Sequence, residues 1–156
     1  MTLGASRALP LLLLCACFGG GSPPVAATDT PQLDDSQIAA FSQRIESFYN
    51  ALEDVPLDAL VTYENKQLRD CFSSQAAFSD YFSSLATEAR DLSFRDTTAR
   101  SVRIREFWFE SPDRAGVDVT FTSVHQRKLR FWSIGFTQHD VWEYVDGVWQ
   151  IVPAKL

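Results

Sequence analysis

Apolar residues recur at helical spacing over three segments in the first two thirds of the chain. In the first segment the apolar positions lie three or four residues apart: Ile38, Phe41, Ile45, Phe48, Tyr49 and Leu52. This spacing predicts an amphipathic helix that begins at residues 34–36, where acidic groups favour the positive end of the helix dipole, and that ends before Pro56. The same criterion predicts a second helix over residues 57–70 and a third over residues 76–90.

From Leu92 onward the apolar period changes to two, which is typical of strands with one buried face. A first strand is predicted to place Val102, Ile104, Glu106 and Trp108 on one face, opposite Arg103, Arg105, Phe107 and Phe109. A second strand follows the turn at residues 111–116, and one of its faces carries Val117, Val119, Phe121, Ser123 and His125. A third strand is predicted over residues 129–145 with a bend at Gly135, and the Asp146-Gly147 hairpin leads to a closing strand over residues 148–152.

The order of elements is therefore three helices followed by a meander of four antiparallel strands. Each helix is too short to be stable alone, so all three must pack on something. This order predicts an α+β domain over residues 35–156, with the three N-terminal helices covering one face of a curved antiparallel sheet.

Composition excludes several classes of function. The chain has 156 residues, 46% hydrophobic and 22% charged, which indicates one globular domain and excludes a disordered chain. The formal net charge of -6 argues against a nucleic-acid partner, because phosphates would be repelled. The chain has two histidines and three cysteines without His-x-His or Cys-x-x-Cys spacing, so we predict no metal site. It also lacks a glycine-rich loop that could bind phosphate, so we predict no cofactor.

Residues 1–16 have the pattern of a secretory signal peptide. Arg7 precedes a short apolar run over residues 9–18, whereas a membrane-spanning helix needs about 20 apolar residues. Two cleavage sites remain open. Leu14-Cys15-Ala16-Cys17 resembles the bacterial lipobox, in which Cys17 would be acylated, with palmitate for example; Val25-Ala26-Ala27 resembles an ordinary site that would release a soluble periplasmic or secreted protein.

The lipobox is the preferred interpretation, because it lies directly at the end of the apolar run. It predicts a lipoprotein attached to the membrane through Cys17, with residues 17–34 as a flexible, lipid-anchored linker. Phe18, in place of the Asp typical of inner-membrane retention, favours the outer membrane of a bacterial cell envelope, facing the periplasm. Cys71 then remains without a disulfide partner, and we expect it to be a small buried residue.

The element order and two segments, residues 142–152 (WEYVDGVWQIV) and residues 45–54 (IESFYNALED), resemble the nuclear transport factor 2-like superfamily. The resemblance covers residues 36–154. It implies a cystatin-like cone in which a bent sheet and helices enclose a pocket. Members include ketosteroid isomerases, polyketide cyclases, dehydratases, transport adaptors and envelope proteins without known activity, so the resemblance implies a fold rather than one activity.

Comparison with ketosteroid isomerases disfavours that reaction. Aligning the first helix on Ala51-Leu52 places Phe48 where those enzymes carry the tyrosine of the oxyanion hole, and Phe cannot donate a hydrogen bond. No counterpart of the catalytic base can be placed between Glu64 and Ser74. Tyr49, one position along, leaves the register of the comparison open.

The candidate ligand-binding residues are aromatic and polar side chains expected on inward faces: Tyr49, Tyr81, His125, Asp140 and Trp142. His125 is the only candidate for a catalytic residue, as a neutral general base, although a structural role at the end of its strand is the alternative. Asp140 could line a pocket or be a solvated strand position. His139 points to the opposite face, so it cannot form a dyad with Asp140.

These features predict a lipid-anchored envelope protein with a non-catalytic domain that binds a small apolar ligand or a protein partner. Aromatic side chains in the sheet half exceed what one helical layer covers, so we expect some of Phe107, Trp108, Phe109 and Trp132 to face outward and to support a homodimer. The alternative is a cyclase-, dehydratase- or isomerase-like enzyme that uses His125 or a pocket carboxylate.

Overall fold

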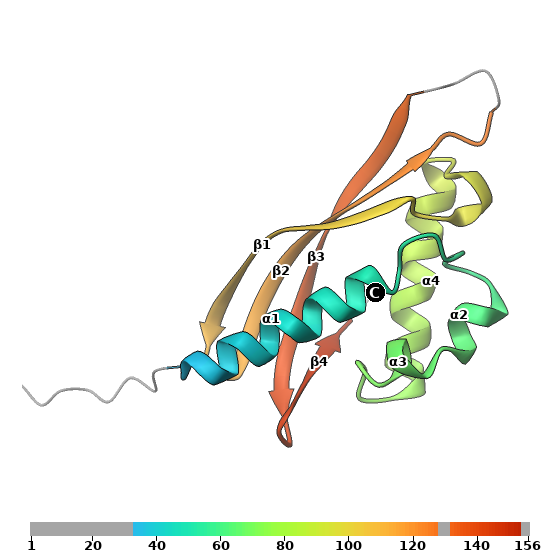
Figure 1. Cartoon of the computed structure of the whole chain (residues 1–156). Coiled ribbons are helices and arrows are strands. Elements are labelled where there is room, and N and C mark those ends of the chain that lie inside the picture. Colours follow the sequence, from blue (N-terminus) through green and yellow to red (C-terminus); the bar gives the residue numbers. More distant parts are fainter. Residues whose placement is uncertain (1–32, 128–131, 154–156) are drawn as a thin grey trace, which may run out of the picture. The chain divides into compact units, whose positions relative to one another are not determined.

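The computed structural model of the chain describes residues 33–127 and 132–153 (Figure 1). Its elements follow in the order α1 (Asp35–Asn50), α2 (Leu60–Glu64), α3 (Lys66–Arg69), α4 (Gln75–Asp91), the short 3-10 helix η1 (Arg95–Thr97), β1 (Ser101–Ser111), β2 (Arg114–Val124), β3 (Ser133–Val145) and β4 (Val148–Val152). The predicted α+β class, with helices before a curved antiparallel sheet, is confirmed, and it is consistent with the cone that the resemblance implies.

The predicted signal peptide, the linker up to residue 32 and the start of the third predicted strand, residues 129–131, lie outside the described residues. Among the helices that the structure describes, none combines the length and the apolar character that crossing a membrane requires.

The predicted first and third helices are α1 and α4, whereas the predicted second helix is divided. Asn65 interrupts the segment, because its backbone is extended (φ −70°, ψ 106°) and its side chain accepts a hydrogen bond from the N–H of Leu68 at the start of α3. Asn is among the residues that most favour this capping position. The prediction of one continuous helix over residues 57–70 is therefore wrong, and two short helices, α2 and α3, take its place.

The four strands pair in chain order, β1-β2-β3-β4, and every pair is antiparallel, as the meander predicted. One register shift changes the facing of β1. Ile104 lies opposite Val119 and Phe107 opposite Val117, with an irregularity between Ile104 and Glu106. The extra residue reverses the alternation, as a β-bulge does.

Because of this bulge, Phe107 and Phe109 share the inner face with Val102 and Ile104, and the predicted division of the first strand into faces is wrong beyond Ile104. The prediction that some of the four sheet aromatics face outward is confirmed by Trp108 and Trp132, which are 37% and 56% exposed, whereas Phe107 and Phe109 pack against the core.

The core is an aromatic cluster between α1, α4 and the inner face of the sheet. Phe41 of α1 is completely buried, and its ring contacts four others at centroid distances of 4.6–6.0 Å: Phe107, Phe109, Trp142 and Trp149. From α4, Phe78, Tyr81 and Phe82 extend the cluster toward Phe72. Large side chains thus fill the space between the helices and the sheet.

Two glycines of the sheet lie where a neighbouring group leaves little room for a side chain. A Cβ added to Gly135 would collide with the Phe121 carbonyl, which belongs to the neighbouring strand, whereas a Cβ on Gly116 would lie 2.6 Å from the ring of Trp108.

We expect Gly135→Ala to lower the free energy of unfolding by about 1–3 kcal/mol, because a strand backbone cannot move aside. Gly116→Ala should cost less, because the half-exposed indole can rotate. Urea unfolding of both variants measures the order, and the reverse order would contradict this account.

Candidate functional site

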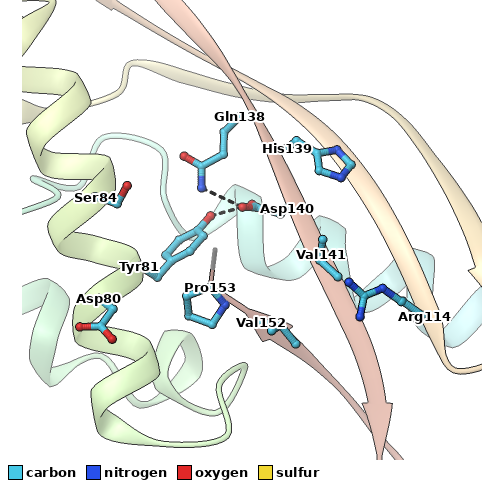
Figure 2. A pocket seen from close by; sticks show the side chains of 10 residues that line it. All are labelled: Asp80, Tyr81, Ser84, Arg114, Gln138, His139, Asp140, Val141, Val152 and Pro153. Atoms are coloured by element: carbon cyan, nitrogen blue, oxygen red, sulfur yellow. Dashed lines mark hydrogen bonds between the residues drawn. The ribbon is translucent and has the colours of Figure 1, made fainter. Parts of the chain in front are cut away.

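The carboxyl group of Asp140 on β3 lies at the centre of a buried hydrogen-bond network. Its side chain points to the inner face, and the residue is only 4% exposed. The Tyr49 hydroxyl of α1 donates to Oδ2 at 2.6 Å, and the Tyr81 hydroxyl of α4 donates to the same oxygen at 2.8 Å. Gln138 Nε2 donates to Oδ1 at 2.8 Å (Figure 2). Two helices and one strand therefore converge on a single carboxyl group.

Trp142 extends this network by one step. Its indole N–H lies 3.4 Å from the Tyr49 hydroxyl oxygen and donates to it, so this hydroxyl both accepts and donates. The Trp142 ring is fully buried and meets the rings of Phe41, Phe48 and Tyr49 edge-on. The network is thus enclosed by aromatic packing.

Local sequence periodicity explains why these side chains meet. Tyr49 follows Phe41, Ile45 and Phe48 on the buried stripe of α1, and Tyr81 lies on the buried stripe of α4. On β3, alternate residues share a face, so Gln138, Asp140 and Trp142 all point inward.

Burial governs the protonation of the network. It raises the pKa of Asp140, and the hydrogen bonds from Tyr49, Gln138 and Tyr81 act in the opposite direction. The pKa values of Tyr49 and Tyr81 lie well above their ordinary value, first through burial and then through the charge of Asp140. Both phenols therefore keep their protons at neutral pH and act as donors.

Four of the five predicted ligand-binding residues, Tyr49, Tyr81, Asp140 and Trp142, lie together in this network. Asp140 is buried, so the alternative of a solvated strand position is wrong for it. His125 is not part of the network: it is 8% exposed, forms a bridge with Phe94, and its Nδ1 accepts the N–H of Arg127 at 3.0 Å. The role of these residues in binding a ligand stays a prediction.

The structure shows where the two adjacent aromatic residues of the first helix point, and the register of the comparison with ketosteroid isomerases stays open. Phe48 packs inside the core, and the adjacent Tyr49 directs its hydroxyl toward Asp140. His139, as expected, lies on the opposite face of β3 from Asp140; its Nδ1 is 3.0 Å from Asp118 Oδ1 and its ring stacks on Trp108.

A cavity of about 400 Å³ borders the network, between α4 and β3 at the end of β4 (Figure 2). Its lining is Asp80, Tyr81, Ser84, Arg114, Gln138, His139, Asp140, Val141, Val152 and Pro153. The rim residues Asp80, Ser84 and Arg114 were not among the predicted site residues. The signal for the first two was their spacing on α4: Asp80 and Ser84 lie four residues apart and so share one face of the helix, and Ser84 lies three residues after Tyr81.

Arg114 is held by two carboxylates, Glu110 at 2.9 Å and Glu143 at 2.5 Å. Within the described ranges, no group of three or more His, Cys, Asp or Glu side chains could hold a metal ion.

The Cys71 thiol is buried, as expected, and burial raises its pKa to about 11, so it is protonated at neutral pH.

Comparisons with known proteins add little to this geometry. No family profile matches the chain, and no curated protein does. A solved structure described as a putative NTF2-like transpeptidase from Campylobacter jejuni is similar over 76% of this chain and 97% of that chain, with 10% sequence identity and a TM-score of 0.34. A likeness at this level carries no argument about the site.

The Asp140 network should make stability depend on pH and on the residue at this position. Asp140→Ala leaves two buried hydroxyls without their acceptor and should lower the free energy of unfolding by about 2–4 kcal/mol. Asp140→Asn should cost far less, because its carbonyl can accept both hydroxyls and a flipped Gln138 amide can accept its NH₂.

The pH dependence has a defined sign. Because burial raises the pKa of Asp140 in the folded state, its carboxyl group stabilises the fold most below its ordinary pKa, and this contribution falls as pH rises toward the folded-state pKa. Urea unfolding from pH 4 to pH 8 should show wild type losing stability relative to Asp140→Asn. A constant difference across this range would contradict the assignment.

Proposed function

We propose that this chain is a lipid-anchored protein of the bacterial envelope whose folded domain binds a partner and does not catalyse a reaction. The proposal that the domain binds a partner and does not catalyse a reaction rests on the hydrogen bonding of Asp140. Both of its oxygens already accept hydrogen bonds, and the residue is only 4% exposed although it lines the cavity. A substrate in the cavity would have to compete with Tyr49, Tyr81 or Gln138 for this carboxyl group.

The lining of the cavity favours a protein partner over a small apolar ligand. Polar groups are contributed to the rim by Asp80, Ser84 and Arg114. An apolar ligand would remove the water that hydrates these groups and would offer them no hydrogen bonds in return. A polypeptide can instead offer its own hydrogen-bonding groups. The binding site proposed here is therefore the surface cavity rather than the inside of the cone.

The anchor is supported by the sequence. The lipobox-like residues 14–17 end the apolar run, and the Gly- and Pro-containing segment that follows provides a tether between an acylated Cys17 and α1. The folded domain would then be held at the membrane surface, where a partner protein can reach its cavity.

One observation favours an enzyme as the second candidate. Two protonated phenols beside a carboxyl group of raised pKa are a combination that general acid–base catalysis uses. In this alternative Asp140, rather than His125, would be the reacting group, because His125 lies outside the network.

The anchor makes a prediction for cells of the native host. Cys17→Ser should move the protein from the membrane fraction to the soluble fraction and abolish labelling by a palmitate analogue, because the acylated side chain is gone. Cys15→Ser is the matched control, since it changes a neighbouring thiol and leaves the acceptor in place. Membrane retention and labelling of the Cys17→Ser protein would contradict the anchor.

The absence of isomerase-type catalysis is testable with a steroid β,γ-enone, whose isomerisation produces a conjugated product with strong ultraviolet absorbance. We expect no acceleration over buffer, because the Tyr49 and Tyr81 hydroxyls are already bonded to Asp140. Acceleration that falls at least about 10²-fold in both Tyr49→Phe and Asp140→Asn, but not in the control Tyr63→Phe, would establish the enzyme alternative.

A further inference from the structure

Two buried side-chain nitrogens have no hydrogen-bond acceptor among the described residues: Nε of Arg44 on α1 and Nε1 of Trp149 on β4. Trp149 is only 4% exposed, and Arg44 is half-buried. A buried N–H group without an acceptor costs free energy and is rare in folded proteins, where it often marks the place of a ligand. The position of these two donors therefore indicates where an acceptor would stabilise the chain.

Both residues line one cavity of about 270 Å³ between α1 and the β3–β4 hairpin. On α1, Ala40 and Arg44 lie four residues apart and so share the face that borders the cavity. The hairpin contributes Tyr144, Val148 and Trp149. This cavity shares no lining residue with the one beside the Asp140 network, so it is a separate site.

The charge of Arg44 determines what kind of acceptor fits. In the part of the chain that the structure describes, Arg44 forms no ion pair, and its Nη2 donates to a neutral acceptor, the Asp70 carbonyl, at 2.6 Å. The carboxylate of Asp70 pairs with Lys66 instead. Because hydrogen bonds between a cation and an anion are about twice as strong as neutral ones, an anion is the acceptor that Arg44 favours.

The walls and the net charge narrow the class of anion. The rings of Tyr144 and Trp149, with centroids 5.2 Å apart, and the side chains of Ala40 and Val148 offer aromatic and apolar surface. The formal net charge of -6 opposes a multiply charged anion more than a singly charged one. A carboxylate is singly charged, and its two oxygens can accept from two different donors.

We propose that the cavity between α1 and the β3–β4 hairpin takes up a carboxylate group, with Arg44 and Trp149 as its N–H donors. The free ligand that fits best is a small carboxylic acid with an aromatic or aliphatic body. The two nitrogens have almost no exposed surface in the structure, so uptake requires the Arg44 side chain to turn. Arg44 is half-buried, and its guanidinium donates only the one hydrogen bond to Asp70 within the described ranges.

Two sources can supply this carboxylate. One is a free molecule. The other is the chain itself, whose carboxylates outside the described residues are the side chain of Asp29 and the terminal group of Leu156. The recognition chemistry is the same in both cases, and the experiment separates the sources.

The test uses the ¹⁵N-labelled chain and benzoate, with the indole N–H resonance of Trp149 as the probe. We expect this resonance to shift in a saturable way with a Kd at or below about 1 mM, because the indole gains an acceptor. The indole resonances of Trp108, Trp132 and Trp142 lie outside the cavity lining and should stay in place. Benzamide, which has nearly the same shape and no charge, should cause no shift.

Two protein variants separate the charge of Arg44 from charge in general. Arg44→Gln should weaken benzoate binding about tenfold or more. Arg105→Gln removes the same charge from an exposed position outside the cavity lining and should leave binding unchanged. If Arg44→Gln does not fold, Trp149→Phe, which keeps a ring and lacks the N–H, should weaken binding several-fold, as read from the amide of Val148.

Two further variants identify a carboxylate supplied by the chain. They are Asp29→Asn and a chain lengthened by Gly-Ser after Leu156, which moves the terminal carboxylate. If either group occupies the cavity, wild type should not respond to benzoate. The variant that removes or displaces the group should then shift the Trp149 indole resonance and bind benzoate.

Three results would overturn the inference. The first is a Trp149 resonance that responds to benzoate neither in wild type nor in the two variants at Asp29 and Leu156. The second is an equal shift with benzamide or with chloride, and the third is undiminished benzoate binding by Arg44→Gln. None of them bears on the cavity beside Asp140 or on the proposed lack of catalysis, which the enone assay tests separately.

Discussion

The packing of helices on the sheet depends on one oxygen atom, Oδ2 of Asp140, which accepts the hydroxyls of Tyr49 and Tyr81. These two donors come from α1 and α4, and the acceptor comes from β3, so the three elements are tied at one point. A buried carboxyl group is costly unless donors compensate it, and a buried hydroxyl is costly without an acceptor. Any shift of either helix along the sheet would therefore leave a polar group unsatisfied, which fixes one arrangement among the many that an aromatic core would tolerate.

Much of this arrangement could be read from the sequence. Residue spacing predicted α1, α4 and the four-stranded meander, and it favoured inward faces for Tyr49, Tyr81 and Trp142. For Asp140 it left a pocket position and a solvated strand position open. What spacing could not provide is the pairing itself. Tyr49 and Tyr81 lie 91 and 59 positions from Asp140, so the choice between a solvated and a buried Asp140 depends on contacts that no local pattern encodes.

The errors in the sequence-based predictions have local physical causes. A single Asn at position 65 caps α3 with its side chain and ends α2, which overrides the apolar spacing that favoured one helix. One extra residue near Arg105 reverses the facing of β1 and turns Phe107 and Phe109 toward Phe41. In both places a single residue outweighs a pattern that extends over ten or more, which is why periodicity is least reliable where elements are interrupted.

The burial of Cys71 also has a consequence for how opening of the fold can be followed. A thiol that is 3% exposed and whose pKa is raised to about 11 reacts slowly with alkylating reagents, which attack thiolates. Its backbone carbonyl accepts the N–H of Ile151, so the same residue also holds the loop after α3 against β4. Modification of this thiol therefore requires that the loop separate from the sheet. The rate of alkylation then measures how often the domain opens at this place.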